Sequence, residues 1–419
     1  MTEPRIPQQG PKEADPFIYV DISSVDNSKK QISGERSLSI SEAPTRARQN
    51  LCAGDVLVSM TRPNLNAVAL VPKVLDGAVG STGFDVLRAR VVNPRWLYYF
   101  VQTPQFVRVM SSKVLGVLYP AVRPKDIRGF PLPIAPLAEQ RRIVEAIETR
   151  FARLDAAVKA LERARAKLKR YRASVLAAVF GNENAPMLPL SALADVRLGK
   201  MVSPRSRDPG LIEMPYLRNE NVQWGRIDYA DVKTMGFRED ELAKYSLNSG
   251  DVLVCEGGHA GRTAIFDGQA GKMLFQKALH RVRPIATRLR PVYLRYYMEY
   301  EVAARRVLPR LSETTIQHLT LEKMKRLPVP APPVELQDRS ISFIEDALSI
   351  SEQVISEVVK GLARVTSLRQ SILHRAFEGR LAPQDPNDEP ASALLERLKT
   401  ANEPTSKPAR RAQRLLVAE

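Results

Sequence analysis

Apolar residues recur at alternating three- and four-residue steps along two long stretches of the chain. Residues 137–180 contain no glycine or proline, and their apolar positions run from Ile143 to Leu168. Residues 334–377 repeat the pattern with a single glycine, Gly361. This periodicity predicts two amphipathic helices. A helix of about 44 residues at 1.5 Å per residue is about 65 Å long, more than one globular core covers, so we expect the two apolar seams to pack as an antiparallel coiled coil.

Shorter apolar runs precede each long stretch. In the first half GDVLVS, AVALVP and FDVLRARVV have the β-branched character and turn boundaries of strands, whereas NPRWLYYFVQTPQFVRVM has a helical pattern. Prolines at 131, 133 and 136, and at 328, 330, 332 and 333, separate these regions from the long helices, because proline excludes helix just upstream. Each region is therefore predicted to be an α+β domain.

The two halves of the chain are similar to each other. Pro131, Gln140 and Glu148 each meet an identical residue 197 positions later. LCAGDVLVS, from Leu51, likewise resembles LNSGDVLVC, from Leu247. A period this long indicates duplicated domains rather than a solenoid, whose units have about 20 to 50 residues. The fold is predicted to be pseudo-two-fold, with two similar α+β domains separated by the two long helices.

We expect five segments in order along the chain. They are a first α+β domain (1–133), a first long helix (134–182), a second α+β domain (183–330), a second long helix (331–381) and a C-terminal tail (382–419). Because Ala382-Pro383 matches Ala185-Pro186, the chain ends where a further repeat would begin. The tail is therefore expected to pack near the first domain and to complete it.

The chain is strongly basic. Of its 419 residues, 63 are Lys or Arg and 46 are Asp or Glu, which gives a formal net charge of +17 at pH 7. Such an excess attracts polyanions and makes nucleic acid the first candidate partner, with a merely solvated basic surface as the alternative. Cys52 and Cys255 are too few for a disulfide framework or a thiolate metal site. No apolar stretch is long enough for a signal peptide or a membrane span, so we expect a soluble cytoplasmic protein without membrane contact.

Motifs for catalysis are missing from the sequence. GGHAGRT, from Gly257, lacks the spacing and the lysine of a phosphate-binding loop. NPRW, from Asn93, has arginine where the amino-methyltransferase motif has proline, so a helix cap is the better interpretation. The four histidines, His259, His280, His318 and His374, lack metal-ligand spacing. We therefore expect no catalytic, metal-binding or cofactor-binding residues.

Two loops rich in hydrogen-bonding side chains follow the repeated GDVLV strand. They are SMTRPNLNAVAL in the first half and CEGGHAGRTAIF in the second. Arg and Lys pair with guanine, Asn and Gln pair with adenine, and glycine lets the backbone approach a duplex closely, so these residue types suit major-groove readout. An ordinary polar surface loop is the alternative for any one of them. The candidate DNA-binding residues are Arg62, Asn64, Asn66, His259 and Arg262, with Lys272, Gln276 and Lys277 as a second group.

These features together resemble the specificity subunit of type I restriction-modification enzymes over almost the whole chain. The motifs that carry the resemblance are PLPIAPLAEQRRIVEAIE, VLRARVVNPRWLYYF and LRQSILHRAFEGRLAPQDPNDEPASALLERL. The proline-rich segment that leads into the second long helix departs from the pattern. It has PPVELQ where PLAEQ is usual, so its acidic residue is Glu335, at a shifted position. This departure puts a functional role for the matching Glu139 in doubt.

The resemblance implies a function and a set of partners. Each α+β domain would be a target recognition domain that reads one half of a bipartite, asymmetric site in double-stranded DNA, and the paired helices would set the gap. Two modification subunits would bind S-adenosylmethionine and methylate adenine, and restriction subunits would translocate and cleave DNA. This chain would hold no cofactor and would not be an enzyme.

Two other functions remain open from the residues alone. A self-sufficient DNA methyltransferase would need a cofactor loop, and the sequence shows none. A coiled-coil tether with a basic surface would bind DNA or RNA of any sequence, with a steep dependence on salt.

Overall fold

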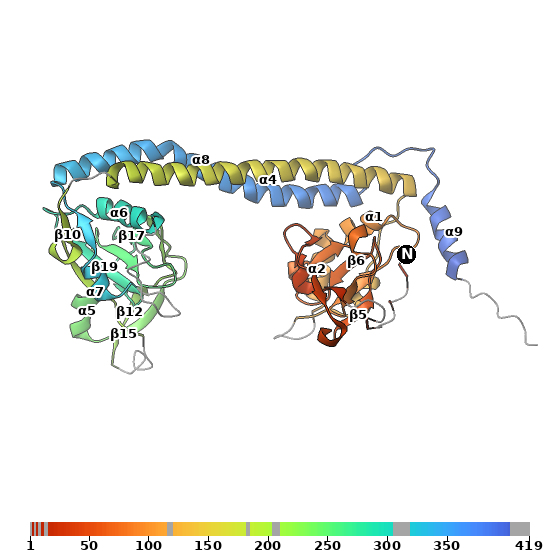
Figure 1. Ribbon diagram of the computed structural model, residues 1–419, viewed down its shortest axis with the longest axis horizontal. Coiled ribbons are helices and arrows are strands. Elements are labelled where there is room, and N and C mark those ends of the chain that lie inside the picture. Colours follow the sequence, from red (N-terminus) through yellow and green to blue (C-terminus); the bar gives the residue numbers. More distant parts are fainter. Residues whose placement is uncertain are drawn as a thin grey trace, which may run out of the picture. The chain divides into compact units, whose positions relative to one another are not determined.

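The computed structural model describes residues 2–3, 6, 10–11, 16–114, 120–181, 185–202, 210–304 and 319–402, with the backbone alone for 398–402. The chain divides into two compact units, one formed by residues 1–160 with 361–419 and the other by residues 161–360. Each unit therefore contains one α+β domain and a part of both long helices (Figure 1). Among the described helices, none is long and apolar enough to cross a membrane.

The first unit is built around β6 (Val56–Ser59), a strand whose four residues are all buried. It pairs antiparallel with β7 (Val68–Leu70) on one side and with β9 (Phe84–Leu87) on the other. Helix α1 (Pro94–Phe100) follows this sheet, and Leu97 and Phe100 share a hydrophobic core with Val56 and Val58. Two further helices complete this side of the domain, α2 (Pro104–Ser112) and α3 (Pro124–Arg128).

A second sheet and a short hairpin lie on the other side of the same domain. The sheet has the order β4-β1-β8-β5 and consists of β1 (Phe17–Val20), β4 (Arg36–Leu38), β5 (Ala47–Asn50) and β8 (Val79–Ser81). The hairpin joins β2 (Val25–Asp26) to β3 (Gln31–Ile32). In the sheet, β1 runs parallel to β8 and antiparallel to β4.

The second unit repeats this plan, with three strands in place of four in its second sheet. Its fully buried strand β16 (Val252–Cys255) pairs antiparallel with β17 (Thr263–Ile265) and β19 (Leu279–Pro284). The second sheet has the order β15-β12-β18, from β12 (Ile212–Leu217), β15 (Lys233–Phe237) and β18 (Leu274–Phe275), and the hairpin joins β13 (Val222–Gln223) to β14 (Arg226–Ile227). Helix α5 (Glu239–Tyr245) precedes β16, and α6 (Pro291–Ala303) takes the place of α1. The predicted duplication of an α+β domain is confirmed.

The two units differ at the edge of the central sheet. In the second unit β11 (Ala194–Leu198) pairs along β19. In the first unit Thr2 forms a bridge with Ala89, and the backbone N–H of Glu3 donates to the carbonyl oxygen of Arg88 at 2.9 Å. The N-terminal residues therefore hold the position that corresponds to β11.

The described part of the C-terminal tail, residues 382–402, packs on the first unit. Asp388 accepts hydrogen bonds from both terminal nitrogens of Arg142, at 3.0 and 2.5 Å, and Leu394 is buried. Residues 391–402 form helix α9 (Ala391–Asn402). Within residues 382–402 no strand is present, and Thr2 and Glu3 occupy the sheet edge beside β9. Residues 403–419 lie outside the described part.

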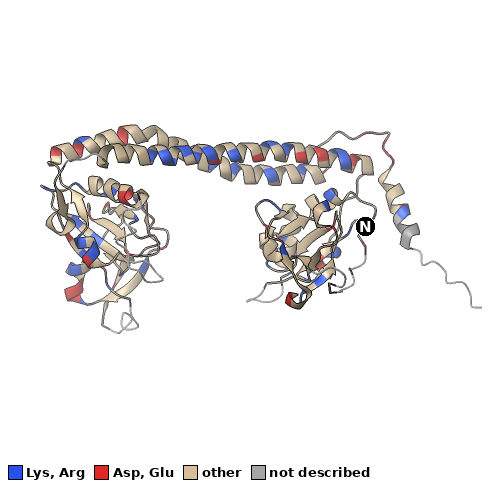
Figure 2. Cartoon of the chain, in the orientation of Figure 1, with Lys and Arg blue, Asp and Glu red and all other residues tan. Residues whose placement is uncertain are grey.

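The two long helices coincide with the two periodic stretches and are a few residues shorter than the expected segments 134–182 and 331–381. They are α4 (Leu137–Phe180) and α8 (Val334–Phe377). In the first unit, Ile143 and Ile147 near the start of α4 pack with Leu373 near the end of α8. In the second unit, Leu176 near the end of α4 packs with Ile344 near the start of α8. The helices therefore run antiparallel in each unit (Figure 1), and charged residues lie along both of them (Figure 2).

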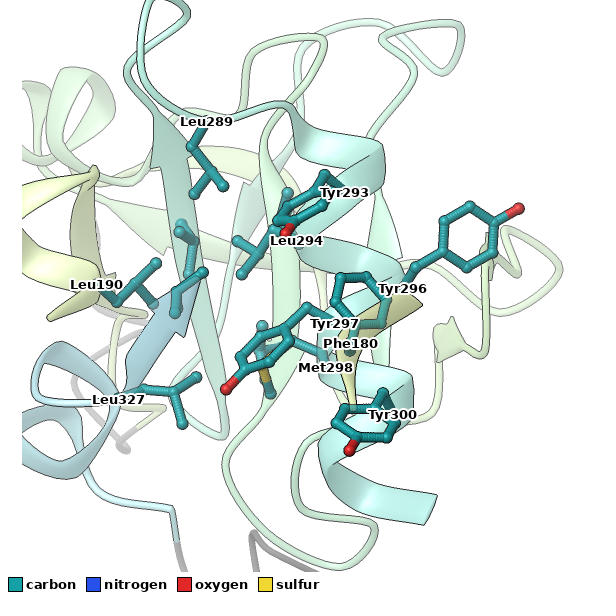
Figure 3. Packing of buried hydrophobic residues seen from close by; sticks show 14 of the residues in the cluster. Phe180, Leu190, Leu289, Tyr293, Leu294, Tyr296, Tyr297, Met298, Tyr300 and Leu327 are labelled. Carbon is teal, nitrogen blue, oxygen red and sulfur yellow. The ribbon is translucent and has the colours of Figure 1, made fainter. Parts of the chain in front are cut away.

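An aromatic residue at the end of each long helix anchors it to a domain. Phe180 lies 5.2 Å from the ring of Tyr293 and 5.5 Å from that of Tyr297, both on α6 (Figure 3). Phe377, its counterpart in the repeat, lies 4.4 Å from the ring of Trp96 on α1. Aromatic pairs at these distances add to the burial of apolar surface. The same joint between helix end and domain is thus formed twice.

A buried glutamine fixes the start of each long helix. The Oε1 atom of Gln140 accepts from the backbone N–H of Asn93 at 2.9 Å, and its Nε2 donates to the carbonyl of Ala135 at 2.8 Å. Gln337 repeats this arrangement, accepting from the N–H of Arg290 at 2.8 Å. Both glutamines are fully buried. Each therefore ties the proline-rich lead-in to the residue that precedes α1 or α6.

Candidate functional site

The loops that carry most of the candidate residues begin where β6 and β16 end, and both strands are held by the same ion pair. Asp55 accepts from Nε of Arg88 at 2.8 Å, and Asp251 accepts from Nε of Arg283 at 2.7 Å. In both pairs the carboxylate is 1% exposed. The hydrogen bonds that Asp251 accepts raise the pKa of Arg283, and those that Asp55 accepts raise the pKa of Arg88. Two-pronged contacts between arginine and a carboxylate fix geometry as well as charge.

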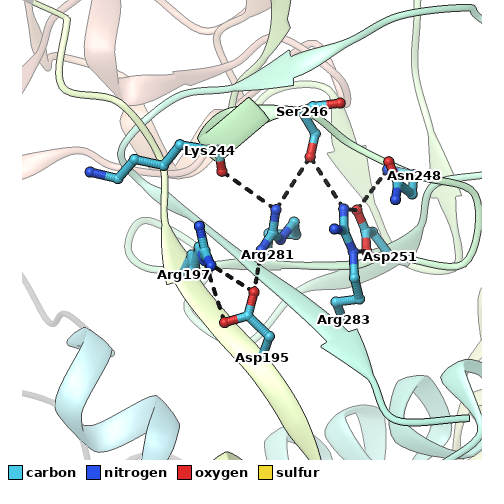
Figure 4. A network of polar contacts seen from close by, with 8 residues as sticks. All are labelled: Asp195, Arg197, Lys244, Ser246, Asn248, Asp251, Arg281 and Arg283. Carbon is cyan, nitrogen blue, oxygen red and sulfur yellow. Dashed lines mark hydrogen bonds and ion pairs between the residues drawn. The ribbon is translucent and has the colours of Figure 1, made fainter. Parts of the chain in front are cut away.

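A larger polar network surrounds this pair in the second unit (Figure 4). Arg281, on β19, is 1% exposed and donates to Oδ2 of Asp195 at 2.5 Å and to the carbonyl of Ser246 at 3.3 Å. Burial lowers the pKa of Arg281, although Asp195 and Asp251 act in the opposite direction. These charges bind strands to one another within the fold.

The loop after β6 presents two exposed side chains. Arg62 and Asn66 both have left-handed backbones, with φ of +47° and +46°, and they enclose the 3-10 turn Pro63–Leu65. The N–H of Arg62 donates to the carbonyl of Pro120 at 2.8 Å, which holds the start of the loop. Within the described residues, the side chains of Arg62 and Asn64 are exposed and have no hydrogen bond or ion pair. They remain candidates for contact with a ligand.

Asn66 has a structural role within the loop. Its Nδ2 donates to the carbonyl of Val101 at 2.8 Å, and its backbone carbonyl accepts from Nζ of Lys30. The hydroxyl of Tyr98 in turn donates to the carbonyl of Lys30 at 2.9 Å. Burial lowers the pKa of Lys30 to about 8. Asn66 is therefore better described as a residue that positions the loop on α1 than as one that reads bases.

In the loop after β16, one candidate residue is exposed and the other has a structural role. His259 is exposed, and it lies between Gly258 and Gly261, whose φ angles are +70° and +86°. Arg262 is half-buried, and its terminal nitrogen donates to the carbonyl of Asn219 at 2.6 Å. Nδ2 of Asn219 donates to the carbonyl of Gly257 at 3.0 Å. Arg262 and Asn219 thus tie the glycine-rich loop to the segment that follows β12, and His259 is left free to meet a ligand.

Asn219 was not predicted from the sequence. No local motif distinguishes it, and its counterpart in the first half, Ile22, is apolar. Its contacts with Gly257 and Arg262 join positions about 40 residues apart, which only the fold brings together. Cys255, which precedes this loop, is buried, and burial raises the pKa of its thiol.

The second group of candidates is divided by β18. Lys272 is exposed and precedes the strand, whereas Gln276 and Lys277 follow it and are half-buried. The N–H of Lys277 donates to the carbonyl of Lys200 at 2.7 Å. The N–H of Glu256, at the start of the glycine-rich loop, donates to the carbonyl of Ala278 at 2.9 Å. Gln276 and Lys277 therefore adjoin this loop, and Lys272 lies at the other end of the strand.

Metal-ligating side chains do not cluster among the described residues. Among them, no group of three or more His, Cys, Asp or Glu side chains could hold a metal ion. Asn93, from the motif that resembles a methyltransferase sequence, accepts a hydrogen bond from the N–H of Arg95 at 2.9 Å and so caps α1, as predicted. His280 is buried, and its Nε2 lies 2.6 Å from the carbonyl oxygen of Leu319, so its ring is held inside the fold. His318 lies outside the described residues.

Comparisons with known proteins agree with the predicted family. A family model described as the type I restriction modification DNA specificity domain matches residues 193–360. The chain is 27% identical over 331 residues to the EcoKI specificity subunit of Escherichia coli K12, and the match covers 73% of this chain and 71% of that protein. It is 26% identical over 336 residues to the StySPI specificity subunit of Salmonella potsdam, with 74% and 72% covered.

A solved structure extends the agreement to the fold. It comes from work on the complex assembly and conformational transition of a type I R-M system, and it matches with a TM-score of 0.73 at 25% identity. The match covers 90% of this chain and 96% of the other. The predicted resemblance is therefore confirmed: over most of its length the chain is similar to specificity subunits of type I restriction-modification systems.

Proposed function

We propose that this chain binds DNA sequence-specifically, with each α+β domain reading one half of a bipartite, asymmetric site. The observation that carries the proposal is a repeated scaffold with unlike loops. β6 and β16 are equivalent buried strands, and each is preceded by an aspartate that is paired with an arginine. The loops that follow them differ, because one carries Arg62 and Asn64 and the other carries His259. Two copies of one scaffold that present different donors and acceptors suit the reading of two different half-sites.

The exposed residues have suitable chemistry for base edges. Arg62 can donate two hydrogen bonds to guanine, and Asn64 can pair with adenine. His259 can donate or accept through its exposed ring, according to its tautomer. The structural roles of Asn66 and Arg262 support these contacts indirectly, because they hold the loops in place. Phosphate contacts from the excess of basic residues would supply affinity that does not depend on sequence.

Catalysis in the proposed complex belongs to partners. Two modification subunits would bind S-adenosylmethionine and methylate the DNA, and restriction subunits would carry out translocation and cleavage. This chain would bind no cofactor itself. The proposal rests on the family and on the lack of a catalytic motif in the sequence.

An exposed apolar stripe on α8 supports the binding of a modification subunit. Leu336, Phe343, Ile350 and Val354 are all exposed, and the first three are spaced by seven residues. Seven-residue spacing places them on one side of the helix. The α4-facing residues Ile344 and Leu348 are buried on a different side. A partner helix laid along this stripe would bury apolar surface that is otherwise in contact with water.

Selection from random DNA tests the proposal. The full chain, assembled with its modification subunits, is incubated with a random-sequence duplex library at fixed salt, and the bound DNA is sequenced. We expect two short motifs separated by a constant gap. A coiled-coil tether would enrich no motif and would lose affinity steeply with salt. A self-sufficient methyltransferase would bind S-adenosylmethionine without its partners, which equilibrium dialysis of the chain alone would detect.

Substitutions in the loops then assign the half-sites. Arg62→Ala and Asn64→Ala are expected to relax one motif only, and His259→Ala the other only, with a loss of about 1–3 kcal/mol for each base contact. Lys73→Ala, an exposed residue on a different turn of the first unit, is the matched control and should change neither motif. If a single loop substitution altered both motifs, the assignment of one half-site to each domain would be wrong.

A further inference from the structure

A run of unpaired basic side chains lies on α4 within the second unit. Between residues 163 and 170 five side chains are Lys or Arg and none is acidic, and they are Arg163, Arg165, Lys167, Lys169 and Arg170. All five are exposed or half-buried, and none has a hydrogen bond or ion pair to another described residue. Figure 2 shows the basic residues gathered along this part of the helix.

The coiled coil does not require these charges. The equivalent positions of α8, 197 residues later, are Lys360, Leu362, Arg364, Thr366 and Ser367. The seam between the helices is apolar in both copies, so packing is preserved where the charge is not. Moreover, Arg163 and Lys167, like Arg165 and Lys169, are four residues apart, where like charges repel and weaken a helix. A binding partner with negative charge would remove this repulsion.

The basic run borders a groove of about 1500 Å³ in the same unit. Lys169 and Arg170 line the groove from α4, and Trp224 and Arg226 line it from the β13–β14 hairpin. Arg163 lies seven residues, or two turns, before Arg170 and so on the same side of α4. Arg172 also faces the groove, but it is paired with Glu299 and Glu352 and adds little net charge.

A hydrogen bond joins the hairpin that lines the groove to β17, the strand that follows the glycine-rich loop that we propose reads bases. The N–H of Gly225, at the tip of the hairpin, donates to the carbonyl of Thr263 at 2.9 Å. Thr263 directly follows Arg262, the last residue of the loop. The hairpin that lines the groove therefore lies next to the end of the loop that carries His259.

We propose that this side of α4, from Arg163 to Arg170, contacts the phosphates of the duplex next to the half-site that the second domain reads. The inference rests on the proposed function. Unpaired cations bind phosphates and release the counterions that surround DNA, so each contact adds to the salt dependence of binding without adding sequence preference. The alternative is a docking site for an acidic protein segment, which the apolar floor of the groove would also suit.

The test compares two variants with equal changes in net charge. Arg163→Gln, Lys169→Gln and Arg170→Gln are combined in α4, because glutamine favours helix about as well as the residues that it replaces. The control combines Lys360→Gln, Arg364→Gln and Arg375→Gln, three exposed basic residues of α8. Assembly of each full chain with its modification subunits is checked by size-exclusion chromatography, and the affinity for selected DNA is measured from low to high salt.

We expect the α4 variant to assemble normally, to keep its sequence preference and to bind at least tenfold more weakly at low salt. Its slope of log affinity against log salt should fall by about 1 for each phosphate that it no longer neutralises, while the control stays close to the unaltered chain. An unchanged slope in a normally assembled α4 variant would overturn the inference. Failure of that variant to assemble would also overturn it and would identify the face as a protein docking site. A lack of sequence preference in the unaltered complex would instead reject the proposed function.

Discussion

Residues of the same type can have different roles in this chain, because some hold a loop in place while others are exposed to solvent. Asn64 and Asn66 are two positions apart, yet the amide of Asn66 is bonded to Val101 while Asn64 is exposed. Sequence reasoning found both, because both have the chemistry of base readout. It could not separate them, since the partner of Asn66 lies 35 residues away and only the packing of the loop on α1 brings the two together.

The buried carboxylate of Asp251 gives a prediction for stability. Asp251→Asn is expected to destabilise the second unit by about 1–3 kcal/mol, because it replaces a two-pronged ionic contact with Arg283 by weaker hydrogen bonds. The partial exposure of Arg283 keeps the loss below that of a fully buried pair. Hydrogen exchange of the amides of β16 and β19 measures the effect on this unit alone.

An exposed pair in the same unit is the control for Asp251. Asp240→Asn removes the partner of Arg238, and both side chains are largely in solvent. Its effect should stay within about 0.5 kcal/mol. Equal losses for Asp240→Asn and Asp251→Asn would show that burial of the repeated pair contributes nothing.

Lys30 gives a prediction for pH dependence. Burial lowers the pKa of Lys30 to about 8 in the folded chain, against an ordinary value of 10.5. Between these two pH values the unfolded chain binds more protons than the folded one, so raising the pH stabilises the fold, and the destabilising effect of burying the charge is fully present below pH 8. We expect the first unit to gain stability from pH 8 to pH 10 relative to a Lys30→Met variant.

The side-chain resonances of Lys30 provide a direct measurement of this pKa. The Cε chemical shift in labelled protein should titrate with a midpoint near pH 8. A midpoint near 10.5 would mean that the ammonium group is well solvated, and the stability difference from the Lys30→Met variant should then be independent of pH over this range.

At the scale of elements, the periodicity of the sequence predicted where the long helices lie, whereas the domains were predicted in outline only. Residues 137–180 and 334–377 are helical as their periodicity indicated, because a long apolar seam without breakers allows few other structures. The edge of the first sheet could not be predicted. Two residues, Thr2 and Glu3, are too short a segment to carry a pattern, and they pair with residues more than 80 positions away.

The buried glutamines at the start of the long helices lead to a prediction about stability. Gln337→Ala is expected to cost about 2–4 kcal/mol, since it removes the acceptor for the N–H of Arg290 and the donor to the carbonyls of Arg288 and Pro332. Urea unfolding followed by circular dichroism reports the change. Arg339→Ala, an exposed substitution two residues later on α8, should change stability by less than about 0.5 kcal/mol and is the control.

The exposed stripe of α8 leads to a prediction about assembly. Phe343→Ser combined with Ile350→Ser should leave the unfolding of the chain nearly unchanged, because these side chains are 54% and 72% exposed. Binding of a modification subunit, measured by titration with the purified subunit, should weaken by at least tenfold if a partner helix lies on the stripe. Normal binding would place that interface elsewhere on the chain.

At the scale of the whole molecule, the proposed reading of a bipartite site depends on the length of the paired helices. Both helices pass from one unit to the other at a defined point, after Ala160 in α4 and after Lys360 in α8. Seven residues inserted at both points preserve the register of the apolar seam and lengthen each helix by about 10 Å, which equals about three base pairs at 3.4 Å each.

The preferred spacing of the half-sites should therefore increase by about three base pairs in the lengthened chain. Affinity is measured for a series of duplexes that keep both motifs and vary only the gap between them. Seven residues inserted in the exposed turn at Ser28-Lys29 leave both helices unaltered, and this control should keep the original preferred gap. If the lengthened chain also kept it, the helices could not be what sets the spacing, because their length would have changed without any effect on the DNA that is bound.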